Sequence, residues 1–224
     1  EKDDFIANAA HQLRNPIAAI QSQAEAAERS KTLSSMKSRV KDVAEAAKKT
    51  SRLTQQLLSM EHISQRSIKS EFKELNLVKL TQEILTKFAL RADKQNVSLS
   101  LECKAKKLLI QGSETFLSEA IDNLIDNALL YGPTNGGSIQ VSLKENDSYA
   151  ELIIKDDGKG IKLELLPNIF DRFFHDSETN SYGSGLGLSI AKTIIEFHEG
   201  KLTLTSDHEG TSLNIILPIS SGVS

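Results

Sequence analysis

The stretch His11-Gln12-Leu13-Arg14-Asn15-Pro16 lies inside an apolar helical repeat near the start of the 224-residue chain. Apolar residues around it recur at intervals of three and four, which is the spacing of a helix that buries one seam against a partner helix. The seam residues are Ile6, Ala10, Leu13, Ile17, Ile20, Ala24 and Ala27. His11 follows one residue after the seam, so the repeat predicts an imidazole on the helix surface.

Two neighbours of His11 affect the same helix surface. Asn15 lies four residues after His11 and therefore shares its face. Pro16 has no N–H group for the carbonyl of Gln12, and we expect it to bend the helix just after the histidine. A neutral imidazole nitrogen is a competent nucleophile, although an ordinary solvated histidine explains this stretch equally well by itself.

A second apolar repeat extends to about residue 66, after a polar connection at about 31–36. It comprises Val40, Val43, Ala47, Thr50, Leu53, Leu57 and Met60. Two helices joined by a short link predict an antiparallel hairpin. One hairpin leaves apolar surface uncovered, so we expect two copies to form a four-helix bundle as a homodimer. The alternative is a monomeric hairpin packed on the following domain.

Composition restricts the partner and the compartment. A formal net charge of −3 gives no electrostatic case for nucleic acid. The single Cys103 cannot form an internal disulfide, which fits a reducing compartment. We therefore expect these residues to be cytoplasmic, and no stretch is long and apolar enough to cross a bilayer. Because the chain begins within a helical repeat, we also expect a fragment whose first helix continues upstream.

From about residue 70 the pattern changes to short strands and helices. We predict strands near 73–75, 97–102, 107–111, 138–145, 149–155, 201–206 and 211–217, and helices near 77–93, 113–131 and 185–198. Ser113 is expected to cap the second of these helices. Strands and helices without strict alternation favour an α+β sandwich, with helices over one face of a mixed sheet. The chain is therefore predicted to contain an all-α hairpin over 1–67 and an α+β domain over 71–220.

An asparagine pair lies within the helix predicted over 113–131. Asn123 and Asn127 are four residues apart and share one face. Their amide oxygens suit a hard cation such as Mg²⁺, which takes its other ligands from phosphates and water. In isolation, however, such a pair is more often a solvated helix face.

Two glycine-containing stretches follow. Asp156-Asp157-Gly158-Lys159-Gly160 comes after a predicted strand, where a carboxylate can accept a hydrogen bond from an exocyclic amine, although a plain turn has the same composition. Gly183-Ser184-Gly185-Leu186-Gly187 precedes a helix, whose first N–H groups can cradle phosphates. Its spacing is neither the dinucleotide fingerprint nor the P-loop. Between them, the aromatic residues of Phe170-Asp171-Arg172-Phe173-Phe174-His175 could anchor a lid.

Taken in order, these motifs closely resemble those of the sensor histidine kinases of two-component signalling, from Phe5 to about Pro218. The resemblance implies a dimerisation and phosphotransfer hairpin followed by a catalytic ATP-binding domain of the gyrase, Hsp90 and MutL type. It implies that His11 accepts the phosphoryl group, that Gln12 and Asn15 assist it, and that ATP and Mg²⁺ are the cofactors. An intact protein in the inner or plasma membrane is implied as well.

The resemblance also assigns the nucleotide site, with Asn127 as the Mg²⁺ ligand. The residues that it implies for ATP are Asn123, Asn127, Tyr131, Asp156, Gly158, Gly160, Phe170, Arg172, Phe173, Gly183, Gly185, Leu186, Gly187 and Thr211. The implied partner is a response regulator, whose receiver aspartate would take the phosphoryl group from His11. Asn15 implies that the protein also dephosphorylates this regulator.

The sequence departs from the family pattern at three positions. Gln12 replaces the usual Glu or Asp, and an amide can orient the imidazole but cannot accept its proton. Leu130 and His175 stand where a basic residue is common.

A gyrase-type ATPase is the alternative enzyme, disfavoured because Asn123 occupies the place of a water-activating glutamate. The alternative from another class is a catalytically silent dimeric scaffold. The stimulus, the regulator, and transfer within or between chains stay open.

Overall fold

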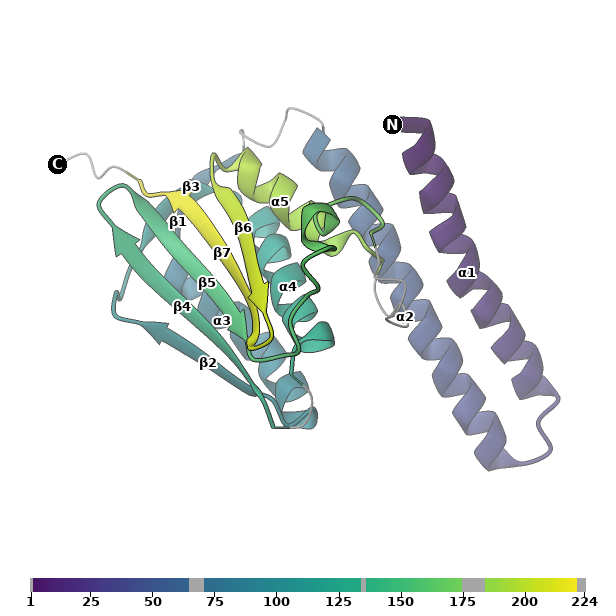
Figure 1. Ribbon diagram of the computed structural model, residues 1–224. Coiled ribbons are helices and arrows are strands. Elements are labelled where there is room, and N and C mark those ends of the chain that lie inside the picture. Colours follow the sequence, from purple (N-terminus) through teal and green to yellow (C-terminus); the bar gives the residue numbers. More distant parts are fainter. Residues whose placement is uncertain (1, 65–70, 134–135, 175–183, 221–224) are drawn as a thin grey trace. The chain divides into compact units, whose positions relative to one another are not determined.

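The computed structural model of the chain describes residues 2–64, 71–133, 136–174 and 184–220. It comprises two compact units, Glu1–His62 and Ile63–Ser224 (Figure 1).

The first unit is an antiparallel hairpin of two long helices, α1 (Lys2–Glu28) and α2 (Leu33–Ser64) (Figure 1). Arg39 of α2 donates a hydrogen bond of 2.8 Å to the side-chain oxygen of Gln23 of α1. The connection is shorter than the predicted 31–36, because the Thr32 hydroxyl accepts the Ser35 N–H at 3.2 Å and starts α2 early. Helix α1 continues through Pro16.

The apolar residues of the hairpin divide between a buried and an exposed face. Ala9, Ala27 and Leu53 are buried. Ile6 and Ile17, which the predicted seam contains together with Ala27, expose 56% and 52% of their surfaces in the single hairpin. An apolar stripe wider than one helix can cover leaves part of its residues in water.

The second unit contains all the predicted strands and helices, with bounds close to those expected. They are β1 (Lys73–Asn76), α3 (Leu77–Lys94), β2 (Ser98–Cys103), β3 (Leu109–Gly112), α4 (Glu114–Tyr131), β4 (Ser138–Asn146), β5 (Tyr149–Asp156), the short 3₁₀ turn η2 (Leu166–Asn168), α5 (Gly187–Phe197), β6 (Lys201–Asp207) and β7 (Gly210–Pro218).

The main sheet has five strands in the order β2-β4-β5-β7-β6. Strand β2 is parallel to β4, whereas the other neighbours are antiparallel, and β1 and β3 form a separate antiparallel pair. Helices α3, α4 and α5 cover one face of the sheet (Figure 1). The unit is therefore the predicted α+β sandwich with a mixed sheet.

Residues in register across β4, β5, β7 and β6 form rows on the helix-covered face. The first row is Leu143, Leu152, Ile215 and Leu202, and the second is Val141, Ile154, Leu213 and Leu204. The third row is Ile139, Asp156, Thr211 and Ser206. The apolar core therefore ends at this row, where three adjacent strands carry polar side chains.

Charged pairs join α4 to α3 through residues that lie about 100° around the helix from the asparagine pair. Arg91 of α3 contacts the carboxylate of Asp126, whose side chain is 5% exposed. Lys87 lies 4.0 Å from the carboxylate of Asp122, one turn earlier. Asp122 and Asp126 directly precede Asn123 and Asn127, so these pairs help to fix the rotation of α4 about its axis.

The prediction that Ser113 caps α4 is right for its position and wrong for its side chain. Ser113 occupies the N-cap position, but its side chain makes no capping hydrogen bond. Its backbone N–H instead donates to Nε2 of the buried His198 at 3.1 Å. The other ring nitrogen of His198 lies 2.7 Å from the Ile194 carbonyl, and the ring stacks on Phe72 at 4.5 Å. His198 thereby ties the end of α5 to the start of α4.

Candidate functional site

The two asparagines of α4 face the first residue of α5. Asn123 is 5% exposed and Asn127 is half-buried. A Cβ atom added at Gly187 would lie 3.5 Å from Nδ2 of Asn127 and 3.6 Å from Oδ1 of Asn123. The absence of a side chain at Gly187 therefore leaves a small space beside both amides. Amide oxygens around such a space fit a hard cation such as Mg²⁺.

The N-terminus of α5 presents backbone N–H groups at the same place. Within the described residues, no side chain caps α5 at Leu186, which is completely buried. The Ser184 hydroxyl accepts the Leu186 N–H at 3.2 Å and so shapes the turn that precedes the helix. Uncapped N–H groups and the helix dipole favour an anion such as a phosphate here.

The segment rich in phenylalanine is attached to α5. The Phe173 N–H donates to the Gly185 carbonyl at 2.8 Å, and Nζ of Lys192 lies 5.2 Å from the centre of the Phe170 ring. Gly185 has a φ of +70°, which suits glycine, and a Cβ there would lie 2.7 Å from Cα of Phe173. Phe170, Phe173, Gly185, Leu186 and Gly187 therefore lie together, while the side chain of Arg172 is exposed.

Asp156 closes the other end of the candidate site, at the end of β5. Its side chain is 6% exposed and its carboxylate accepts the Gly158 N–H at 2.9 Å. Burial raises the pKa of Asp156, and backbone hydrogen bonds from Gly158 and Thr211 oppose this effect only in part. A buried carboxylate with this environment can accept a hydrogen bond from a ligand amine.

Glycines allow the end of α4 to approach Asp156. A Cβ at Gly132 would lie 3.1 Å from Cγ of Asp156, and one at Gly158 would lie 2.6 Å from Cα of Gly132. Tyr131, the last residue of α4, is 41% exposed. Tyr131 follows Asn127 by four residues and therefore shares its face of α4. This face leads from the asparagine pair towards Asp156.

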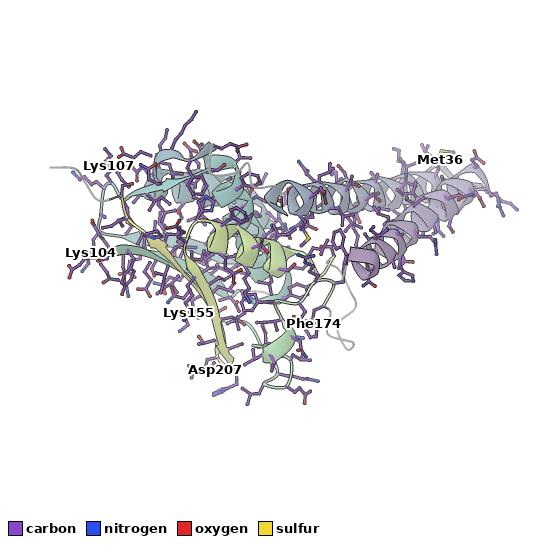
Figure 2. The ribbon with its side chains drawn as sticks, turned by 90° about the horizontal axis from the view of Figure 1, so that it is seen from above. Met36, Lys104, Lys107, Lys155, Phe174 and Asp207 are labelled. Atoms are coloured by element: carbon purple, nitrogen blue, oxygen red, sulfur yellow. The ribbon has the colours of Figure 1, made fainter. Side chains whose placement is uncertain are left out.

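The remaining predicted residues of this domain lie at the same edge or outside the described ranges. Thr211 is the cross-strand neighbour of Asp156. Gly160 has a φ of +70° and contacts the Asp207 backbone, and Figure 2 shows Asp207 at the end of β6 that is distant from Lys104 and Lys107. Gly183 and His175 lie outside the described residues. Sequence reasoning missed Gly132 and Ser206, since nothing in their spacing distinguishes a packing glycine or a strand serine.

His11 is exposed on α1, as predicted, and Asn15 is exposed one turn later. Gln12 between them is half-buried. All three belong to the first compact unit.

The domain models of known families match both units. Residues 1–66 match the His Kinase A (phospho-acceptor) domain, and residues 112–221 match the histidine kinase-, DNA gyrase B-, and HSP90-like ATPase. The chain belongs to the sensor histidine kinases of two-component signalling. Its second unit is therefore an ATP-binding domain of the kind that this family uses.

Known relatives of this histidine kinase include bacterial sensor proteins. Sensor protein kinase PmrB of Pseudomonas aeruginosa is 31% identical over 212 residues, which are 94% of this chain and 44% of that protein. The chain spans about half the length of the curated relatives it matches.

Solved structures share the fold of this histidine kinase. The mycobacterial sensor histidine kinase MprB is 28% identical with a TM-score of 0.58, and the match covers 66% of this chain and 97% of that one. Histidine kinase ThkA, solved in complex with response regulator protein TrrA, is 24% identical with a TM-score of 0.77, covering 99% of this chain and 63% of that one.

The described residues contain neither a membrane-spanning helix nor a cluster of acidic, histidine and cysteine ligands. None of the helices there has the length and apolarity that crossing a membrane requires. The membrane location of the intact protein therefore stays a prediction. No three His, Cys, Asp or Glu residues in the described ranges gather as a metal site.

Proposed function

We propose that this histidine kinase transfers the γ-phosphoryl group of ATP to His11 and then passes it to an aspartate of a response regulator. The observation that carries this proposal is the pair of α4 amides, Asn123 and Asn127, facing Gly187 at the uncapped start of α5. The exposed His11 on the separate hairpin supplies the acceptor.

The nucleotide would lie along α4, with its base at Asp156 and its phosphates at α5. The Asp156 carboxylate accepts a hydrogen bond from the exocyclic amine of adenine, beside Tyr131 and Thr211. Gly185, Leu186 and Gly187 bring backbone N–H groups to the phosphates. Asn127 is the proposed Mg²⁺ ligand, and Mg²⁺, when bound, supplies charge neutralisation of the triphosphate. Residues 170–174, with Phe170, Arg172 and Phe173, would cover the nucleotide.

The reaction at His11 is an in-line displacement. A neutral ring nitrogen of His11 attacks the γ-phosphorus, an N–P bond forms, the bond to the β-phosphate oxygen breaks, and ADP leaves. The amide of Gln12 can orient the imidazole but cannot take its remaining proton, which passes to water. A loose transition state needs mainly alignment and charge stabilisation, so transfer does not require a general base at Gln12.

The hairpin is proposed to dimerise through its exposed apolar face. Ile6, Ile17, Val40 and Leu58 each expose more than half of their surfaces. A second copy of the hairpin would cover these residues in a four-helix bundle. The same bundle would present His11 to the receiver domain of the regulator.

Removal of the phosphoryl group from the regulator is proposed as a second activity. Asn15 is exposed on the same face as His11, where its amide can position a water molecule for attack on the aspartyl phosphate. The lifetime of the phosphorylated regulator, measured with this protein and ADP, tests this activity. An unchanged lifetime, or an equal lifetime with Asn15→Ala, would contradict it.

The kinase proposal is tested by incubating the full chain with [γ-³²P]ATP. We expect acid-labile, base-stable label on the protein, absent from His11→Gln and retained in His208→Gln, a matched change at another exposed histidine. Unchanged labelling of His11→Gln would refute the assignment. ATP turnover without labelling would favour the gyrase-type ATPase, and ATP binding with neither would favour the scaffold.

A further inference from the structure

The polar row at the edge of the sheet contains one residue that the family motifs do not account for. Asp156 on β5, Thr211 on β7 and Ser206 on β6 are paired in register, and the two preceding rows are apolar. We propose that Ser206 fixes the hydrogen-bond polarity of Thr211 and thereby helps the site select a purine with an exocyclic amino group over one with a keto group. This inference rests on the proposed nucleotide function.

The hydrogen bonds of Ser206 leave only one arrangement of hydrogens. Its oxygen lies 2.8 Å from the Ile161 nitrogen, 2.9 Å from the Gly210 carbonyl oxygen and 3.0 Å from Oγ1 of Thr211. A hydroxyl has one hydrogen to donate and two lone pairs. The Ile161 N–H can only donate and the Gly210 carbonyl can only accept. Ser206 therefore donates to Gly210, accepts from Ile161, and accepts its second hydrogen bond from Thr211.

This arrangement determines what Thr211 can offer a ligand. Because its single hydroxyl hydrogen points to Ser206, the Thr211 oxygen has only lone pairs left. Asp156, its neighbour across the strand pair, is also an acceptor when ionised. Two adjacent acceptors complement an amino group, which has two hydrogens to donate, and they oppose a keto oxygen. The Gly210 carbonyl on β7 and the Ile161 N–H thus fix the direction of the Thr211 hydroxyl hydrogen through Ser206.

A purely structural role for Ser206 makes a different prediction. Ser206 joins the β6–β7 hairpin to the turn at Gly160, so its loss could loosen the whole site. Looser packing would weaken the binding of every nucleotide by a similar factor. Loss of the fixed orientation of the Thr211 hydroxyl would instead weaken the discrimination between amino and keto purines. A Thr211 hydroxyl released from Ser206 can rotate and donate to a keto oxygen.

The test compares the dissociation constants of ADP and inosine diphosphate for the full chain. We expect Ser206→Ala to reduce the preference for ADP about fivefold or more, as loss of one oriented hydrogen bond does. Ser206→Thr, which keeps the hydroxyl, should restore the preference. Thr205→Ala is the matched control, because Thr205 is the preceding residue on the exposed face of β6. It should bind both nucleotides like the wild type.

The same substitution, made in a Thr211→Val protein, separates the loss of the fixed hydroxyl orientation from a general loss of packing. In Thr211→Val the hydroxyl is absent, so Ser206→Ala should no longer change the preference. An unchanged preference in Ser206→Ala, with both affinities reduced alike, would overturn the inference while leaving the kinase proposal intact. If Ser206→Ala lowered the preference for ADP equally in the wild type and in Thr211→Val, the inference would also be overturned. If the wild-type chain binds no ADP, the proposed function fails and this inference fails with it.

Discussion

The carboxyl groups of Asp156 and Asp157 belong to adjacent residues, yet their pKa values are shifted in opposite directions. Burial raises the pKa of Asp156. Hydrogen bonds from the backbone and side chain of Ser138, at 2.8, 2.9 and 2.7 Å, lower the pKa of Asp157. One carboxylate therefore faces the proposed ligand and the other fastens the start of β4, and the two roles can be tested separately.

Nucleotide affinity should depend on pH through Asp156. We expect ADP to bind more weakly as the pH falls through the raised pKa of Asp156, because the protonated carboxyl group is a poorer acceptor for the adenine amine. Titration calorimetry between about pH 4 and pH 7 measures this. Asp156→Asn should bind weakly at every pH, whereas Asp93→Asn, an exposed matched change, should follow the wild type. An equally steep pH dependence in Asp156→Asn would contradict the assignment.

The same carboxyl group should oppose folding at neutral pH. Its folded pKa lies above the unfolded value of 3.8, so the folded domain binds the proton more tightly. The contribution of Asp156 to stability is then present below pH 3.8 and is lost as the pH rises through the folded pKa. At neutral pH, Asp156→Asn should therefore be at least as stable as the wild type in urea unfolding while it loses nucleotide binding. A large loss of stability would show that the carboxylate is structural.

Asp157 should show the opposite dependence. Its lowered folded pKa means that its contribution to stability is complete above pH 3.8 and is lost as the pH falls through the folded pKa. Because the carboxylate is exposed, we expect Asp157→Asn to cost only about 0.5–1 kcal/mol in urea unfolding at neutral pH. Ser138→Ala should cost less, and its effect should shrink in the Asp157→Asn background. Additive losses would show that the two side chains act independently.

Gly185 and Gly187 should respond differently to alanine. At Gly187 the added Cβ meets the asparagine amides at ordinary contact distances, so Gly187→Ala should fold normally but occupy the phosphate space. We expect a roughly tenfold or larger loss of ATP affinity, equivalent to about 1.5–3 kcal/mol for one hydrogen bond to a charged group. Gly185→Ala should also lose stability, because its φ is +70° and the Phe173 backbone is too close. Equal unfolding curves for the two variants would contradict this difference.

The contact between Arg91 and Asp126 should influence nucleotide binding by fixing the orientation of α4. Arg91→Ala removes a charged partner from a carboxylate that is 5% exposed, and we expect a loss of about 1–3 kcal/mol in stability together with weaker ADP binding. The control is Lys79→Ala, because the Lys79–Glu83 pair on α3 is largely exposed and should contribute less than about 0.5 kcal/mol. If Arg91→Ala lowered the stability but left the ADP affinity unaltered, the contact would contribute to folding and not to nucleotide binding.

Periodicity and turn chemistry predicted most of this architecture, while tertiary contacts decided the rest. The strands around Val141 and Ile154 alternate clearly, and His11 lies off its apolar stripe, so their positions were readable. The division of Ile6 and Ala9 between an exposed and a buried face depends on where α2 packs. The bonds of Ser113 to His198 and of Ser206 to Ile161 join residues distant in sequence, and no local pattern encodes them.

The uncovered stripe of Ile6, Ile17, Val40 and Leu58 has a calorimetric consequence. Two long helices with so much apolar surface in water gain most of their stability from association, so their melting temperature should rise with protein concentration. The sandwich formed by the rest of the chain has its own core, and its transition should be independent of dilution. A thermogram recorded at several concentrations should therefore show one peak that moves and another that stays in place.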